Sequence, residues 1–131
     1  ISGNNAAGSL WKIGIRSPEN KLFDIYSNIN LTDIAVATSG SYLNYFTIDD
    51  INYSHLIDPE TGFPIQHELV SATILASDCA TADAIATAVM IKGLKEGLTW
   101  IESLPLVEGM LIVRNNHGEY VQKKTKGFIF D

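Results

Sequence analysis

One stretch of the chain, residues 54 to 64, combines side chains that could carry chemistry with residues that would hold them rigidly. His55 and Asp58 supply the reactive groups. Pro59 fixes its own φ and favours an extended conformation at Asp58, while Gly62 allows the chain to turn back. A histidine where a strand meets such a loop is a candidate for proton transfer or ligand binding. A proline-braced surface turn, whose histidine has no chemical role, would show the same pattern.

A second candidate lies on a predicted helix, where Asp83 and Thr87 are separated by four positions. This spacing places the carboxylate and the hydroxyl on one helical face, one turn apart. Oxygen ligands of this kind suit a hard cation such as Mg²⁺. The small residues around them would let another backbone or a ligand approach closely. The alternative is a helix that packs tightly through its alanines, with Asp83 favoured by the helix dipole.

A third candidate is the run of small and hydroxyl-bearing residues from Ala37 to Ser41, which Tyr42 follows. A turn of this composition after a buried strand can present N–H groups and hydroxyls to an anion. The tyrosine beside it could contact a flat ring. An ordinary strand–turn–strand connection explains the same residues. His67 and His117 lie in or near predicted turns, and both are interpreted as exposed residues without a role.

The elements that would position these candidates follow from the hydrophobic pattern, which changes along the chain. Period-two alternation and β-branched runs predict strands first, and an alanine-rich segment from Asp78 to Lys92 predicts a helix with Gly93 as its terminator. A second helix is predicted over residues 94–102. Strands followed by a helical pair and further strands indicate an α+β fold with a mostly antiparallel sheet. The predicted strands are 11–16, 22–29, 34–38, 42–48, 52–57, 70–76, 110–114, 119–122 and 127–130.

Length and composition narrow the function classes. A chain of 131 residues with 46% hydrophobic content suggests a single domain, residues 1–131, with a packed core. The net charge of −6 argues against a nucleic-acid partner, because phosphate binding needs clustered positive charge. Cys79 is the only cysteine, and it is predicted to be a small buried residue. The chain starts without a methionine, so we expect a fragment or a processed product.

Taken together and in this order, the three candidates resemble the FAD:protein FMN transferases, the ApbE-type flavin transferases. The resemblance runs through essentially the whole chain and matches the C-terminal part of that family. It implies an ApbE-like, T-fold-like architecture in which the N-terminal half, with its flavin contacts and part of the metal site, is absent. Ser2-Gly3 stands where a glycine pair is usual in the family. The matching segments are Ala37 to Tyr42, His55 to Pro64 and Thr81 to Thr87.

The resemblance implies a magnesium-dependent bacterial enzyme of protein flavinylation. It would cleave FAD, transfer FMN to a Thr or Ser hydroxyl of an acceptor protein, and release AMP. Asp83 and Thr87 would bind Mg²⁺, and His55 would act in proton transfer or orientation. This activity is expected of the full-length parent, and the alternatives are a non-catalytic FAD-binding module or an inactive fragment. The residues implied to contact the flavin nucleotide are Gly3, Thr38, Ser39, Gly40, Tyr42 and His55.

The resemblance also implies a location. Members of the family commonly act in the periplasm or as lipoproteins anchored to the outer face of a bacterial cytoplasmic membrane. The sequence itself has no apolar run approaching the roughly eighteen residues that a membrane helix needs. It indicates neither the acceptor protein nor the oligomeric state.

Overall fold

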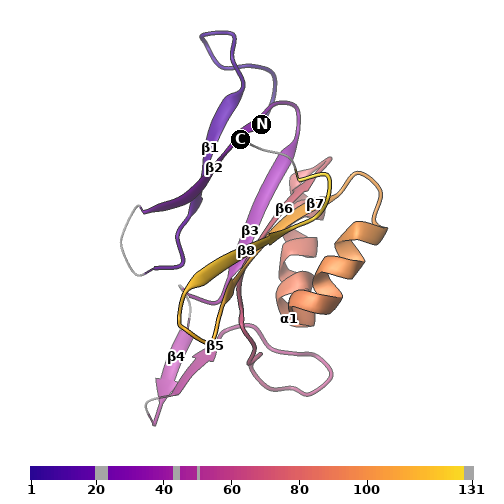
Figure 1. Cartoon of the computed structure of the whole chain (residues 1–131). Helices are drawn as coiled ribbons and strands as arrows, with labels where there is room; N and C mark the ends of the chain where they lie inside the picture. Colours follow the sequence, from indigo (N-terminus) through magenta and orange to yellow (C-terminus); the bar gives the residue numbers. More distant parts are fainter. Residues whose placement is uncertain (20–23, 43–44, 50, 129–131) are drawn as a thin grey trace.

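The computed structural model describes residues 1–19, 24–42, 45–49 and 51–128. Its elements are β1 (Trp11–Arg16), β2 (Ile25–Leu31), β3 (Ala35–Gly40), β4 (Tyr45–Ile48), β5 (Ile51–Ser54), β6 (Leu69–Ala76), α1 (Cys79–Ser103), β7 (Glu108–Arg114) and β8 (Tyr120–Lys124). The central sheet is antiparallel with the strand order β3-β6-β7-β8, and β1–β2 and β4–β5 form separate hairpins (Figure 1). The predicted α+β class with a mostly antiparallel sheet is confirmed.

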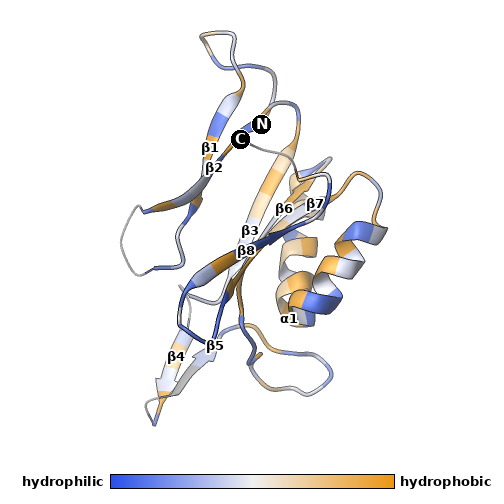
Figure 2. Cartoon of the chain, viewed as in Figure 1, coloured by the Kyte–Doolittle hydropathy of each residue, from blue (hydrophilic) through white to orange (hydrophobic). Residues whose placement is uncertain are grey.

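The sheet is packed on both faces, because successive side chains of a strand point to opposite sides. On one face of β6, Leu69 and Ile74 pack in the cluster that includes the buried stripe of α1. On the other face, Leu75 belongs to a second cluster with Ile15 of β1 and Ile29 of β2. Figure 2 shows the hydrophobic colour concentrated on the inner strands and on the side of α1 that faces them. The sheet is therefore held between a helix and a hairpin.

Helix α1 consists of two helical segments that meet at Gly93, whose φ of 76° and ψ of −178° are not helical. The predicted pair of helices is present in this form. Asp78 is the N-cap, since its Oδ1 accepts a hydrogen bond of 2.9 Å from the backbone N–H of Thr81. That bond is the main reason why the pKa of Asp78 lies below its ordinary value. No helix in the described part of the chain is long and apolar enough to cross a membrane.

Several predicted boundaries and environments were wrong. β3 continues through Ser39 and Gly40, which pair with Ala72 and Ser71, so these residues do not break the strand. Cys79 is exposed, because it opens α1 before the buried stripe of that helix begins at Ala82.

The predicted strand 22–29 begins later and runs from Ile25 to Leu31, and residues 20–23 lie outside the described ranges. Likewise, residues 127 and 128 are not in a strand, and the rest of the predicted strand 127–130 is not described. Residues 43–44 of the predicted strand 42–48 are also outside the described ranges, and its described part, Tyr45–Ile48, forms β4.

Candidate functional site

The loop that follows β5 is organised by Asp58. Its backbone N–H donates to the carbonyl of Phe63 at 2.9 Å, and its carbonyl accepts from the N–H of Gly62 at 2.8 Å. Its side-chain Oδ1 accepts from the N–H of Glu60 at 2.9 Å. Gly62 has a φ of 72°, which explains the requirement for glycine in this turn. Asp58 is thus engaged in holding the loop, while His55 at the end of β5 is exposed.

Two of the sequence candidates meet where β3 packs against α1. Ser39 Oγ and Thr87 Oγ1 lie 3.1 Å apart and share a hydrogen bond. Asp83 is one helical turn before Thr87 and is exposed. This contact joins the small-residue segment at the end of β3 to the helical face that carries the predicted metal ligands.

Thr38 lies on the opposite face of β3 from Ser39. Its Oγ1 forms a hydrogen bond of 2.9 Å with Oγ1 of Thr73, on the side of β6 where Leu75 packs in the cluster with hairpin β1–β2. The alternation of a continuous strand causes this separation. The predicted grouping of Thr38 with Ser39 therefore does not extend to their side chains.

Gly40 and Tyr42 form a unit of their own at the end of β3. A β-carbon on Gly40 would lie 2.4 Å from Cε1 of Tyr42, so the tyrosine ring occupies the space that a side chain would need. The backbone N–H of Ser41 donates to the carbonyl of Val70 at 3.1 Å and fixes this corner. Burial raises the pKa of the Tyr42 phenol, and the nearby Arg16 guanidinium acts in the opposite direction.

Gly3 lies at the other end of β3, beside the connection from β2. Its N–H donates to Oδ1 of Asp33 at 2.8 Å, and its carbonyl accepts from Oγ1 of Thr32 at 2.9 Å. The first of these bonds is the main cause of the lowered pKa of Asp33. The length of β3, roughly 17 Å for six extended residues, separates Gly3 from Tyr42. The structure does not bring these two predicted flavin contacts together.

His67 was predicted to be exposed and without a role, and this prediction was wrong. Its side chain is half-buried, and its Nε2 donates to the carbonyl of Met90 at 2.7 Å. The non-helical Gly93 interrupts α1 at this point, and carbonyls at the end of a helical segment need other donors. The imidazole ring also packs over Gly93, 3.4 Å from the position of a β-carbon. The sequence signal that could have found this role is the predicted helix terminator, which implies unpaired carbonyls nearby.

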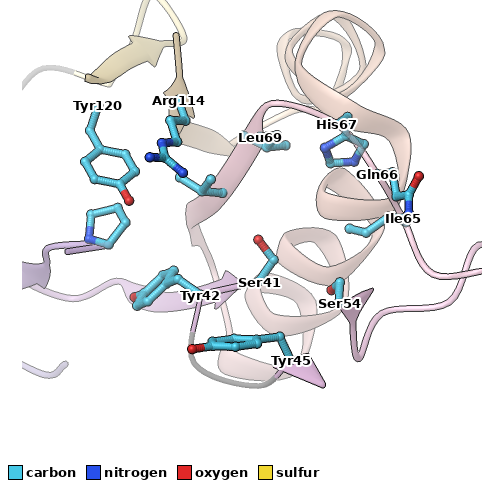
Figure 3. A pocket seen from close by; sticks show the side chains of 12 residues that line it. Ser41, Tyr42, Tyr45, Ser54, Ile65, Gln66, His67, Leu69, Arg114 and Tyr120 are labelled. Atoms are coloured by element: carbon cyan, nitrogen blue, oxygen red, sulfur yellow. The ribbon is translucent and has the colours of Figure 1, made fainter. Parts of the chain in front are cut away.

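A pocket with a volume of 690 Å³ opens at the end of the sheet where β3 and β7 finish and β6 and β8 begin (Figure 3). Tyr42 is the only one of the predicted site residues that lines it, although Ser54, another lining residue, directly precedes His55. Apart from Ser41, which belongs to the third sequence candidate, sequence reasoning missed the other polar lining residues, because they come from segments far apart in the chain. Among them are Tyr45, His67, Arg114 and Tyr120.

The predicted magnesium ligands match the chemistry of the ion, since a carboxylate and a hydroxyl supply oxygen donors. The side chain of Asp83 forms no hydrogen bond or ion pair with any other described residue, so its carboxylate is available to a ligand. Within the described ranges, no group of three or more His, Cys, Asp or Glu side chains is arranged to hold a metal ion. The two helical residues therefore fit as part of a metal site.

The chain is similar to known proteins in both sequence and fold. Residues 1–111 match the model of the ApbE family. The chain is 38% identical to the FAD:protein FMN transferase of Vibrio cholerae, over 98% of the chain and 39% of that relative. It is similar to the structure of the ApbE protein of Thermotoga maritima, with a TM-score of 0.80 and 31% identity over 96% of the chain and 39% of that protein.

The flavinyl transferase ApbE of Pseudomonas stutzeri, solved in its apo form, is also similar. It gives a TM-score of 0.77 and 35% identity over 97% of the chain and 38% of that protein. The chain thus spans about two fifths of the length of these relatives. The family model covers most of the sequence, and relatives of the same family share both its sequence and its fold. The chain belongs to the ApbE family.

Proposed function

We propose that the protein is a magnesium-dependent flavin transferase, which moves FMN from FAD to a Thr or Ser hydroxyl of an acceptor protein and releases AMP. The observation that carries the proposal is the contact between Ser39 and Thr87, which joins the end of β3 to the helical face of Asp83. Membership of the ApbE family supports it, as does the printed name of the Vibrio cholerae relative, FAD:protein FMN transferase.

Asp83 and Thr87 are the residues that would hold Mg²⁺. When Thr87 donates its hydroxyl proton to Ser39 Oγ, both lone pairs of its own oxygen stay available for a ligand. Ser39 would then orient the Thr87 hydroxyl rather than bind the ion. The bound ion would supply charge neutralisation for the pyrophosphate oxygens.

His55 is the residue that we assign to proton transfer or orientation. In the transfer, the acceptor oxygen bonds to the phosphorus of the FMN part, the bond from that phosphorus to the AMP oxygen breaks, and the acceptor hydroxyl loses its proton. An exposed imidazole next to a braced loop can reach an acceptor that arrives from outside. Because phosphoryl transfer depends mainly on positioning, the rigidity that Asp58 gives the loop would contribute to the rate.

The flavin nucleotide would contact the chain on both sides of the end of β3. Ser39 faces α1, whereas Tyr42 packs over Gly40 and offers a ring to a flat ligand. Thr38 and Gly3 stay proposed contacts, and each would meet a different part of an extended dinucleotide. Family resemblance further supports a periplasmic or lipoprotein location, which membrane fractionation of the source cells would test.

The test uses the purified protein with FAD, Mg²⁺ and an acceptor peptide that contains a threonine. Released AMP is measured by chromatography and attached FMN by the mass of the peptide. Asp83→Ala should abolish the metal-dependent reaction, whereas Glu96→Ala, a matched loss of an exposed carboxylate on the same helix, should leave it unchanged. Equal activity and equal Mg²⁺ dependence in the Asp83 variant would remove that residue from the metal site. FAD binding without AMP release would select a non-catalytic FAD-binding module instead.

A further inference from the structure

The hairpin formed by β4 and β5 stands apart from the rest of the molecule. Every residue of β4 is exposed, and within the described residues each of the two strands pairs only with the other. Figure 1 shows the hairpin projecting away from the central sheet and from α1. A hairpin of two strands is only marginally stable by itself in water, so contact with a partner would stabilise this one.

The two faces of the hairpin have different surroundings. Tyr45 and Ser54 form a cross-strand pair, and both are in the wall of the pocket at the end of the sheet (Figure 3). The next pair, Phe46 and Tyr53, lies on the opposite face, because successive side chains of a strand alternate. Its rings are stacked, with centroids 5.5 Å apart and an angle of 16° between the planes. Ile48 is on the same face, and we call these three residues the hairpin patch.

The hairpin patch is apolar and open to water. Phe46 is 47% exposed and Ile48 is 54% exposed. A large apolar side chain has a surface of about 200 Å², so together these two leave about 200 Å² in contact with water. A stable interface between two proteins buries about 800 Å² on each of them. The patch is therefore too small to hold two copies of the chain together and has the size for a short segment that binds and leaves.

The charge around the hairpin also disfavours a second copy. The sequence has no Lys or Arg between Lys21 and Lys92. Asp49 at the tip of the hairpin and Glu60 in the loop after β5 are both exposed carboxylates. A second copy would bring the same negative charges against them, whereas a segment that carries a lysine or arginine would be attracted.

The hairpin patch is close to the residue assigned to proton transfer. Only one residue separates Tyr53 from His55, so their α-carbons are about 7 Å apart along the chain, and His55 is exposed. A strand with one paired edge offers backbone N–H and C=O groups to another extended segment. A polypeptide that lies along β5 with one side chain on the patch would thus bring the side chain two residues away to His55.

We propose that the hairpin patch docks the acceptor protein of the transfer reaction through an extended segment. A bulky apolar side chain of that segment lies against Phe46 and Tyr53, a lysine or arginine beside it faces the acidic surroundings, and the Thr or Ser hydroxyl reaches His55. The inference rests on the proposed function, because it names the chemistry of the acceptor in that reaction.

The probe is a fluorescently labelled peptide, Lys-Phe-Ala-Thr-Ala-Phe-Lys, which has a phenylalanine two residues from the threonine on either side and therefore fits either strand direction. Its binding to the purified protein is measured by fluorescence anisotropy, with a chelator present and FAD absent so that no transfer occurs. A peptide with alanine in place of both phenylalanines should bind at least about fivefold more weakly, as expected for an aromatic anchor. A peptide with glutamate in place of both lysines should also bind more weakly.

Phe46→Ala should remove most of the difference between the phenylalanine and alanine peptides, and Phe46→Leu should restore part of it. The matched control is Leu106→Ala, which shortens another exposed apolar side chain in the connection between α1 and β7 and should not alter peptide affinity. Circular dichroism shows whether each variant is folded, and since Phe46 and Leu106 are exposed we expect all three to fold.

Equal affinity for the phenylalanine and alanine peptides would overturn the proposal, as would a loss in Phe46→Ala no larger than in Leu106→Ala. Sedimentation velocity gives a further refutation: a wild-type dimer that Phe46→Ala separates would mean that a second copy occupies the patch. The two proposals fail separately. Peptide binding that depends on Phe46 without AMP release contradicts the transfer reaction alone, whereas equally efficient transfer to both peptides contradicts the docking proposal alone.

Discussion

Replacing Gly93 by alanine should destabilise the protein, although the same change stabilises an ordinary helical position. The φ of 76° and ψ of −178° at Gly93 fall in a region that essentially only glycine occupies, and a residue with a β-carbon there costs about 1–3 kcal/mol. The new β-carbon would lie 3.4 Å from Cδ2 of His67, which is an ordinary contact and adds no clash. We therefore expect the free energy of unfolding to fall by about 1–3 kcal/mol.

Urea unfolding followed by far-UV circular dichroism measures this change. The urea concentration at the midpoint of unfolding should fall, while the slope of the unfolding free energy against urea concentration should stay constant, since the surface exposed on unfolding is unaltered. Ala84→Gly, at an exposed position in the first helical segment, is the control. It should lower the free energy of unfolding by about 1 kcal/mol, the usual difference between alanine and glycine inside a helix. If Gly93→Ala raises the free energy of unfolding, α1 is a continuous helix in solution and the capping role of His67 is refuted.

Substitutions at three other positions test the helix cap, the contact between Ser39 and Thr87, and the loop after β5. Asp78→Asn retains an N-cap acceptor, so it should lose less stability at neutral pH than Asp78→Ala. Because hydrogen bonds from Thr81 lower the pKa of Asp78, its stabilisation is present above the ordinary value of 3.8 and disappears as pH falls through the lower folded-state pKa. Both variants should show less acid destabilisation than the wild type in urea unfolding at decreasing pH, and unchanged acid sensitivity would contradict this. Ser39→Ala should lower the free energy of unfolding by about 1 kcal/mol in the same urea assay, because it removes one hydrogen bond. It should also raise the Mg²⁺ concentration needed for half-maximal transfer. An unaltered Mg²⁺ dependence would mean that Ser39 does not orient Thr87. His55→Ala should keep FAD affinity and slow transfer, and a wild-type rate would reduce His55 to a structural residue.

The local elements of the fold were predictable because their signals are short-range. Asp78 as N-cap and Gly93 as terminator follow from residue types that act within one helical turn, and both are found in the structure. The hydrogen bonds that hold the loop after β5 were predictable for the same reason, since Asp58 and Gly62 act on backbone groups within a few residues. These features need no knowledge of the remaining chain.

The features that the sequence did not predict depend on contacts between distant segments. Ser39 and Gly40 have the composition of a turn, but pairing with β6 keeps them in the strand and turns Thr38 and Ser39 to opposite faces. His67 acquires its role only because the end of a helical segment lies beside it. The pocket is assembled from at least five segments of the chain, so no local pattern reveals that Arg114 belongs to it.

The most direct test of the proposed transfer reaction is the ratio of its two products. Incubation of the protein with FAD, Mg²⁺ and a threonine-containing acceptor should yield AMP and FMN-modified acceptor in equal amounts, and no product when a chelator replaces Mg²⁺. AMP without modified acceptor would mean that water takes the place of the acceptor hydroxyl and that the protein hydrolyses FAD. The absence of both products would contradict the proposed transfer reaction.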